Sequence, residues 1–392
     1  MKKQMVCFLA AASILGMTCL PEVACAAAPV QEAAIKSEDG LKKMPPPPMR
    51  RPKMSKKEAV VRLQHEFGEV AQSAESYLAA GINYNELRTA YLYAGMSGKN
   101  VDDILDLRES ATWGRVRYLL GITAGEYAEK SLGHELERLQ EDAVLTKAIA
   151  EKYVKLGYSL SDIKMAAKLA AKSSYTLGEI LPMKNVVEDW NAVQEKLGIP
   201  SSEKKIPMFR GRGHRSGAGF AGLHARNMTK ERAVRIFKAD YKFDEKQLGA
   251  LYDKYGYEAT EDICLLAYLA KTKLEKVEMM RNVYSWERIK YILGLTPQLY
   301  FDRCVEYQAR RLKERMGIPE KVTRKLMQQG FAMHHVNMSY LLAKICKKPV
   351  EDVIILKTPH NTWNDVAKKL GISEAECQQI KDKISKDFGR HD

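Results

Sequence analysis

The stretch WGRVRYLLGI, residues 113–122, decides the fold because the chain repeats its frame four times. The other copies are WNAVQEKLGI at 190–199, WERIKYILGL at 286–295 and WNDVAKKLGI at 363–372. Every tryptophan of the chain opens one of these stretches. Each is followed by Val or Ile three positions later, Leu at the seventh position and Gly at the eighth. Internal repeats of this kind identify the building unit of a repeat protein.

The shared frame predicts how a helix ends. Offsets of 0, 3 and 7 place the apolar residues on one face of a helix. Glycine at the eighth position suits a left-handed residue beyond the helix, and the apolar residue after it can fold back in a Schellman motif. We interpret the tryptophans as core anchors, with a ligand-stacking role as the alternative. The predicted repeat anchors are Trp113, Trp190, Trp286, Trp363, Gly121, Gly198, Gly294 and Gly371. The predicted N-caps of the helices that follow are Thr123, Ser201 or Ser202, Thr296 and Ser373.

The four copies are arranged in pairs. The first copy is as far from the third as the second is from the fourth, and the spacing within the two pairs is also equal. The openings MSKKEAVVRL at 54–63 and MTKERAVRIF at 228–237 resemble each other as well. Apolar residues recur at helical spacing throughout, and no convincing strand is present. We therefore predict an all-α fold of four related helical repeats of about 77 residues, arranged as two duplicated halves at 54–200 and 228–392.

The N-terminus predicts export. Two lysines precede an apolar run at residues 5–20, and the sequence A-C-A at 24–26 supplies a small-residue cleavage site. Together these features are typical of a secretory signal peptide, which we assign to residues 1–26, with cleavage after Ala28 as the alternative. The Pro-rich, basic residues 27–53 predict a disordered tether. The expected location is the periplasm, the cell surface or the medium, with no transmembrane segment after cleavage.

The charge favours anionic partners. The chain has 63 Lys and Arg against 49 Asp and Glu, a net charge of +14, and removal of residues 1–26 would leave +13. For an exported protein, we expect this excess to attract an anionic envelope polymer, a membrane surface or a partner protein. A generally basic, solvated surface is the alternative.

The segment 201–227 between the halves is the predicted binding site. It is rich in Gly and Arg and lacks an apolar period, which predicts a linker or loop. Guanidinium groups on an unconstrained backbone suit contact with phosphate or carboxylate groups. The predicted anion-binding residues are Arg210, Arg212, Arg215 and Arg226. A linker kept soluble by arginine is the alternative.

The sequence lacks the motifs of common catalytic and metal sites. His334 and His335 are neighbours that would point about 100° apart on a helix, which suits a shared metal poorly. We assign no catalytic residue, no metal and no cofactor; an enzyme with an unrecognised site between the halves is an alternative. Four cysteines outside the signal peptide are interpreted as buried free thiols, with disulfides of open pairing as the alternative. These are Cys264, Cys304, Cys346 and Cys377.

Residues 366–380 offer a nucleic-acid alternative. Ala367, Gly371 and Cys377 have the spacing of a helix-turn-helix unit. Two packed helices joined by a short turn would look the same without touching DNA. The predicted export argues against nucleic acid as the partner.

Helices rich in small residues are predicted at 162–172, DIKMAAKLAAK, and at 262–271, DICLLAYLAK. Together with the W-x7-G close, they resemble the repeat of uncharacterised exported proteins of bacteria, over about residues 78–375. The resemblance implies an all-helical repeat fold and bacterial export, and it carries no activity or site residue. From the residues and the charge we expect an exported, non-catalytic helical-repeat interaction protein that binds an anionic envelope component or a partner protein.

Overall fold

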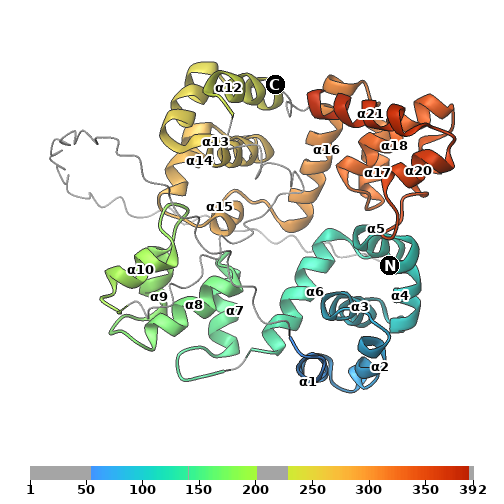
Figure 1. Cartoon of the computed structure of the whole chain (residues 1–392). Helices are drawn as coiled ribbons and strands as arrows, with labels where there is room; N and C mark the ends of the chain where they lie inside the picture. The colour runs from blue at the N-terminus through green and yellow to red at the C-terminus, as the bar shows by residue number, and fades with distance from the viewer. Residues whose placement is uncertain (1–53, 140, 201–227, 388–392) are drawn as a thin grey trace, which may run out of the picture. The chain divides into compact units, whose positions relative to one another are not determined.

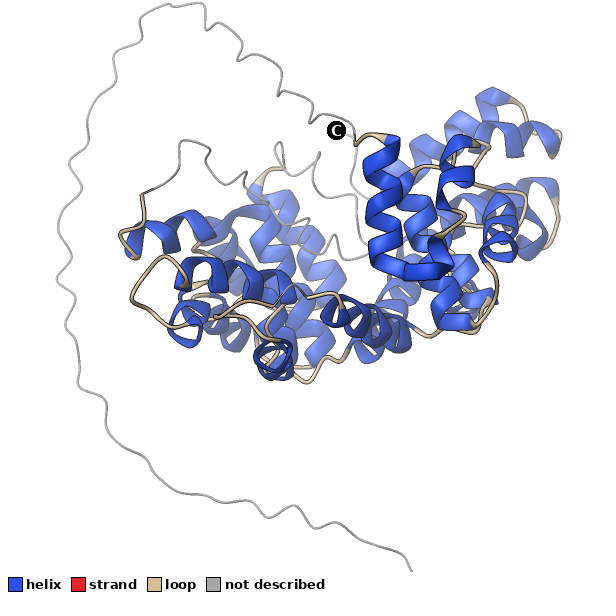
Figure 2. Cartoon of the chain, turned by 90° about the horizontal axis from the view of Figure 1, so that it is seen from below, coloured by secondary structure: helices blue, strands red, loops and turns tan. Residues whose placement is uncertain are grey.

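The computed structural model describes residues 54–139, 141–200 and 228–387, and within them it contains twenty α-helices and no strand. The predicted all-α fold is therefore confirmed for this part of the chain, as Figure 2 shows. Residues 54–392 belong to one compact unit. We refer below to the described residues 54–200 as the first half and 228–387 as the second half.

The first half is made of helices joined by turns and loops (Figure 1). Its elements are α1 Lys56–Phe67, the 3-10 helix η1 Gly68–Ala71, α2 Ala74–Ala79, α3 Tyr84–Ser97, α4 Val101–Ser110, α5 Trp113–Leu119, α6 Ala124–Glu137, α7 Lys147–Lys155, α8 Leu160–Ala170, α9 Leu177–Ile180, the 3-10 helix η2 Leu181–Met183 and α10 Trp190–Lys196.

The second half contains two longer helices, α13 and α16, and Gly256 kinks α13 with a φ of 73°. Its elements are α12 Lys230–Tyr241, α13 Glu245–Ala270, α14 Leu274–Arg281, α15 Trp286–Ile292, α16 Pro297–Met316, α17 Glu320–Gln328, α18 Met333–Cys346, α19 Val350–Ile354, α20 Trp363–Lys369 and α21 Glu374–Asp387.

Helices α5, α10, α15 and α20 begin at the four tryptophans and are all of the same length. After α5, the amide of Gly121 donates to the carbonyl of Tyr118 and the amide of Ile122 donates to that of Arg117. Gly121 has the left-handed φ of 70° that this turn requires, and the other three helices end with the same pair of bonds. The predicted Schellman closure is therefore present at all four sites.

The predicted N-caps that fall in the described residues act as caps. The side-chain oxygens of Thr123, Thr296 and Ser373 accept bonds from the amides three residues later, at 3.1, 3.3 and 3.3 Å. These bonds satisfy amides that the helix itself leaves without a partner. Ser201 and Ser202 lie outside the described residues.

The core is divided into separate apolar clusters, and each tryptophan packs at the edge of a different one. The four tryptophans are half-buried against the clusters around α3, α8, α13 and α18. This placement fits the core-anchor interpretation. The predicted free thiols are confirmed, with Cys264 and Cys377 buried and Cys304 and Cys346 only half-buried.

Candidate functional site at the contact between the halves

The predicted anion-binding residues Arg210, Arg212, Arg215 and Arg226 lie outside the described residues. The candidate site lies instead at the contacts between the two halves, which the sequence interpretation did not predict. These contacts occur in sets whose members recur at the offset that separates Trp113 from Trp286. We call the residues related by this step counterparts.

In the first set, α5 packs against the end of α17. A Cβ atom built on Gly114 would lie 2.6 Å from the carbonyl oxygen of Gly330, so the two backbones touch directly. Arg115 donates from Nη1 to the carbonyl of Gln329 at 3.2 Å. Its guanidinium carbon lies 4.9 Å from the ring centre of Tyr118 and 5.0 Å from that of Phe331, a cation–π arrangement that spans the contact.

In the second set, α15 packs against the end of α7. The ring and Cβ of Tyr291 cover Gly157. The guanidinium carbon of Arg288 lies 5.1 Å from the ring centre of Tyr291 and 5.4 Å from that of Tyr158. Arg288 thus bridges an aromatic ring of its own helix and one of the other half, as Arg115 does.

The residues of these two sets correspond one to one as counterparts. The corresponding pairs are Arg115 and Arg288, Tyr118 and Tyr291, Tyr158 and Phe331, and Gly157 and Gly330. The arginine–aromatic contacts are reciprocal: Arg115 meets Phe331 of the second half, and its counterpart Arg288 meets Tyr158 of the first. The two glycines differ, because Gly330 meets backbone and Gly157 meets the side chain of Tyr291. Reciprocal contacts of this kind are the mark of a two-fold related interface.

Between these sets, α6 contacts α16. The amide of Gly125 donates to Oε1 of Gln298 at 3.0 Å, and these two residues are themselves counterparts. A residue that faces its own counterpart lies where a two-fold axis would pass. Gln298 is held in place because its Nε2 donates to Asp302 at 2.8 Å.

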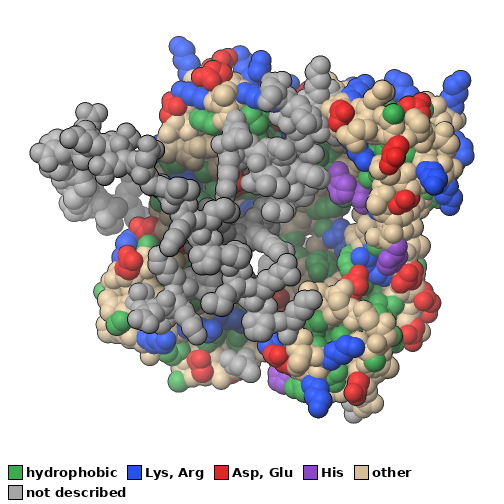
Figure 3. All heavy atoms as spheres, in the orientation of Figure 1, with side chains coloured by type: hydrophobic (Ala, Val, Ile, Leu, Met, Phe, Trp, Pro, Cys, Tyr) green, Lys and Arg blue, Asp and Glu red, His purple; other side chains and the backbone are tan. Residues whose placement is uncertain are grey.

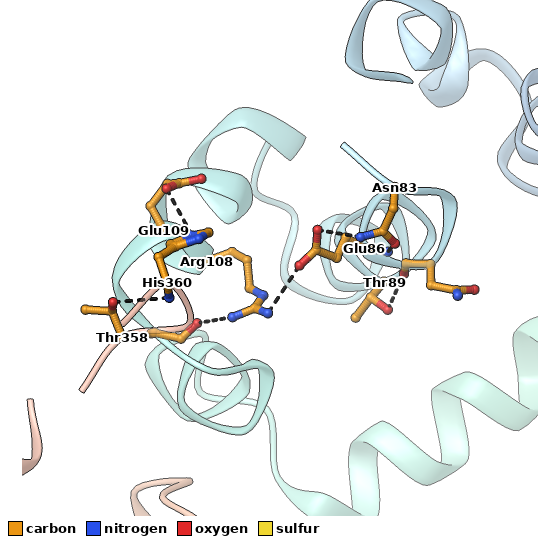
Figure 4. Close-up of polar contacts among 9 residues, drawn as sticks. Asn83, Glu86, Thr89, Arg108, Glu109, Thr358 and His360 are labelled. Atoms are coloured by element: carbon orange, nitrogen blue, oxygen red, sulfur yellow. Dashed lines mark hydrogen bonds and ion pairs between the residues drawn. The ribbon is translucent and has the colours of Figure 1, made fainter. Parts of the chain in front are cut away.

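A fourth set joins the loops before α10 and α20 to the ends of α14 and α4. Asn185 donates from Nδ2 to the carbonyl of Asn282 at 2.9 Å. In the corresponding place of the other half, His360 lies 3.2 Å from Glu109 (Figure 4). Figure 4 also shows that Arg108 holds the end of α4 by donating to Glu86. The contacting segments correspond here too, although the chemistry differs.

Each half also holds its first helix in place with a buried carboxylate. Glu66 of α1 pairs with Arg88 at 2.8 Å and with Arg138, just after α6, at 2.7 Å. In the second half, Asp240 of α12 pairs with Arg315 of α16 at 2.6 Å. The sequence interpretation assigned no role to either carboxylate. A buried carboxylate of this kind is held by its ion pairs, and it positions the helices.

The most strongly perturbed carboxyl group belongs to the interior of the second half. Burial raises the pKa of Glu261 to about 7, while nearby Arg311 acts in the opposite direction. The group lies near the stacked pair Tyr241 and Tyr307, whose ring centres are 5.4 Å apart. Perturbed carboxyl groups can mark an active site, but packing within the core accounts for this one.

Of the histidine pair in the second half, His334 is exposed and His335 is half-buried. The rings of His334 and His335 lie 4.0 Å apart, and His335 meets the ring of Trp363 edge-on at 5.8 Å. Burial lowers the pKa of His335 to about 3, so this ring stays neutral. In the described residues no group of three or more His, Cys, Asp or Glu side chains could hold a metal ion.

The helix-turn-helix-like unit is the pair α20 and α21. Ala367 and Cys377 are buried in one cluster with residues of α18, and α21 also contacts α18. Packing accounts for the spacing that suggested this unit. In the part of the chain that the structure describes, no helix is long and apolar enough to cross a membrane.

Comparison with protein-family models and with curated protein sequences gave no match to this chain.

Proposed function

We propose that the protein is an exported, non-catalytic helical-repeat interaction protein, in which two duplicated halves close on each other and present a basic scaffold to an anionic envelope component or a partner protein. The observation that carries this proposal is the reciprocal contact between the halves. The contact explains why α5 and α15 carry the same arginine and tyrosine: these side chains hold the two halves together.

The order of the helices supports the duplication of one half into two. Each helix from α4 to α10 begins at the counterpart of the first residue of a helix from α14 to α20, one for one and in the same order. The step from α5 to α10 also equals the step from α15 to α20. Such agreement follows naturally when one unit has been copied, because each helix then keeps its place in the packing.

The anionic partner is supported by the charge and by two groups of cationic side chains. Figure 3 shows Lys and Arg spread over the described residues of both halves, interspersed with Asp and Glu. Lys164, Lys168 and Lys172 follow one another at four-residue spacing along α8 and its end, where they share one face. The arginines of 201–227 form the second group. Both groups suit a polyanion, whose binding would weaken with added salt.

The proposal is tested with the secreted protein in a salt series on anionic vesicles, isolated wall polymer and RNA. One variant changes the four arginines of 201–227 named above to serine, and a second changes Lys164, Lys168 and Lys172 to serine. Both variants should lower the affinity, and the salt slope should fall by about one for each cation that contacts the polymer.

A matched control replaces three scattered, exposed lysines, Lys57, Lys99 and Lys246, and should lose little affinity. Absence of binding to all three anionic materials at about 0.15 M salt would contradict the anionic partner. Tighter binding to RNA than to vesicles or wall polymer would favour the nucleic-acid alternative instead.

A further inference from the structure

The two halves present each other with nearly the same contact surface. Away from the centre, both surfaces offer an arginine between aromatic rings and a glycine that a helix of the other half covers. A surface of this kind is self-complementary, so two like halves from different copies of the chain could also pair. Specific pairing of a first half with a second half therefore requires a feature of the interface that disfavours the pairing of two like halves.

The asymmetry lies where α6 meets α16. Gly125 and Gln298 occupy counterpart positions, each the second residue of its helix, and they face each other. A Cβ atom built on Gly125 would lie 3.1 Å from Cβ and 3.6 Å from Oε1 of Gln298. The space next to Gly125 is therefore already filled by the glutamine side chain, and a second side chain does not fit without a shift.

Like pairings fail at this point in two different ways. Two second halves would bring Gln298 against Gln298, where the space holds one side chain. Two first halves would bring Gly125 against Gly125, so that both amides lose the Oε1 acceptor that Gln298 supplies. Amides in the first turn of a helix have no partner within the helix, so this loss is not made up locally.

We propose that the Gly125–Gln298 pair is the specificity determinant of the interface, which makes a first half accept only a second half, from its own chain or from another copy. Asp302 acts as a positioning residue, because it accepts from Nε2 of Gln298 and thereby turns Oε1 toward Gly125. The inference rests on the two-half organisation proposed above.

The test exchanges the two residues in the full chain. The variants are G125Q, Q298G and the exchanged double variant G125Q/Q298G, studied by thermal unfolding and by light scattering during gel filtration. Each single variant should lower the unfolding midpoint by about 2–4 °C. The exchanged variant should recover most of that loss, because the pair is restored with its members reversed.

A control comes from the same helix. Gly133 of α6 has open space around it, so G133Q should keep or raise the midpoint through its better helix propensity. Losses that add up in the exchanged variant would overturn the proposal, as would single variants that leave the midpoint unchanged. Binding to anionic material is measured separately, so failure here is distinguishable from failure of the proposed function.

Discussion

Four glycines, two in each half, allow the contribution of the contact between the halves to stability to be measured directly. Gly81, Gly157, Gly256 and Gly330 all have positive φ, of 98°, 86°, 73° and 87°. Alanine would be strained by about 1–2 kcal/mol at Gly81, Gly157 and Gly330, because a side chain is disfavoured at positive φ. At Gly256 the strain would reach up to about 3 kcal/mol, because its ψ of −175° lies in a region that is essentially restricted to glycine. Alanine also restricts the unfolded chain by a similar amount at each position, so this effect cancels in comparisons between them.

The surroundings separate the four glycines into two pairs. A Cβ atom on Gly81 or Gly256 would meet nothing within 4 Å. One on Gly330 would lie under 3.0 Å from backbone atoms of Gly114 and Arg115, and one on Gly157 would lie under 3.0 Å from Cβ and Cγ of Tyr291. Overpacking of this kind typically destabilises by about 1–3 kcal/mol more.

We therefore expect the alanine variants at 157 and 330 to lose about 2–5 kcal/mol, against about 1–2 kcal/mol at 81 and up to about 3 kcal/mol at 256. Gly330 should be the most sensitive, because backbone of the other half blocks it and cannot rotate away. Urea denaturation followed by circular dichroism and tryptophan fluorescence measures the differences. Equal losses at all four positions would refute the reasoning, since only the local strain would then be present.

Three further outcomes are expected. Burial raises the pKa of Glu261 from 4.5 to about 7, so between these values the folded protein keeps a proton that the unfolded chain releases. The stability should therefore fall as the pH rises from 4.5 to about 7. E261Q should reduce this fall, measured as the difference between the denaturation midpoints at pH 5 and pH 8. Lys271 and Lys347 sit at helix ends with φ of 53°, so K271G and K347G should each raise stability by up to about 1 kcal/mol in the same assay, and a loss would show that these side chains are needed. E66Q should lower the free energy of unfolding by about 2–3 kcal/mol, which is less than for a fully enclosed ion pair because Arg88 and Arg138 are partly exposed. The control E58Q removes an exposed ion pair and should change the free energy of unfolding by no more than about 0.5 kcal/mol.

The local features of the fold could be predicted from the sequence because their causes are local. Glycine eight residues after each tryptophan fixes a left-handed turn, and an apolar residue follows it, so the helix ends could be placed before any packing was known. The caps at Thr123, Thr296 and Ser373 depend in the same way on residues within one turn.

The contact between the halves was harder to predict, although part of its signal was present. The frames of 113–122 and 286–295 carry Arg two residues after Trp and Tyr five residues after it, whereas the frames of 190–199 and 363–372 carry Ala or Asp and Glu or Lys there. The pattern that all four copies share does not include these two positions. The copies differ because α5 and α15 pack against the other half, and the partner of each position lies far away in the chain.

The buried carboxylates could not be predicted from local pattern. Glu66 and Asp240 lie near the ends of helices rich in charge, where acidic residues are usually solvated. Their burial depends on arginines that lie on α16 or directly after α6. Arg311 lies 3.2 Å from Asp240 and is the counterpart of Arg138, but this correspondence in the sequence did not indicate an acidic partner.

The central claim is that counterpart positions of the two halves meet at Gly125 and Gln298. Disulfide trapping in the chain without residues 1–26 tests it most directly, with both residues changed to cysteine. The control is the same chain with the wild-type residues, whose four cysteines are free. Two Cβ atoms at this separation need only about half an ångström of relaxation to form a disulfide. We predict a cross-link within one chain, identified by mass spectrometry as a peptide that joins α6 to α16. Free thiols at both positions after oxidation would contradict the claim.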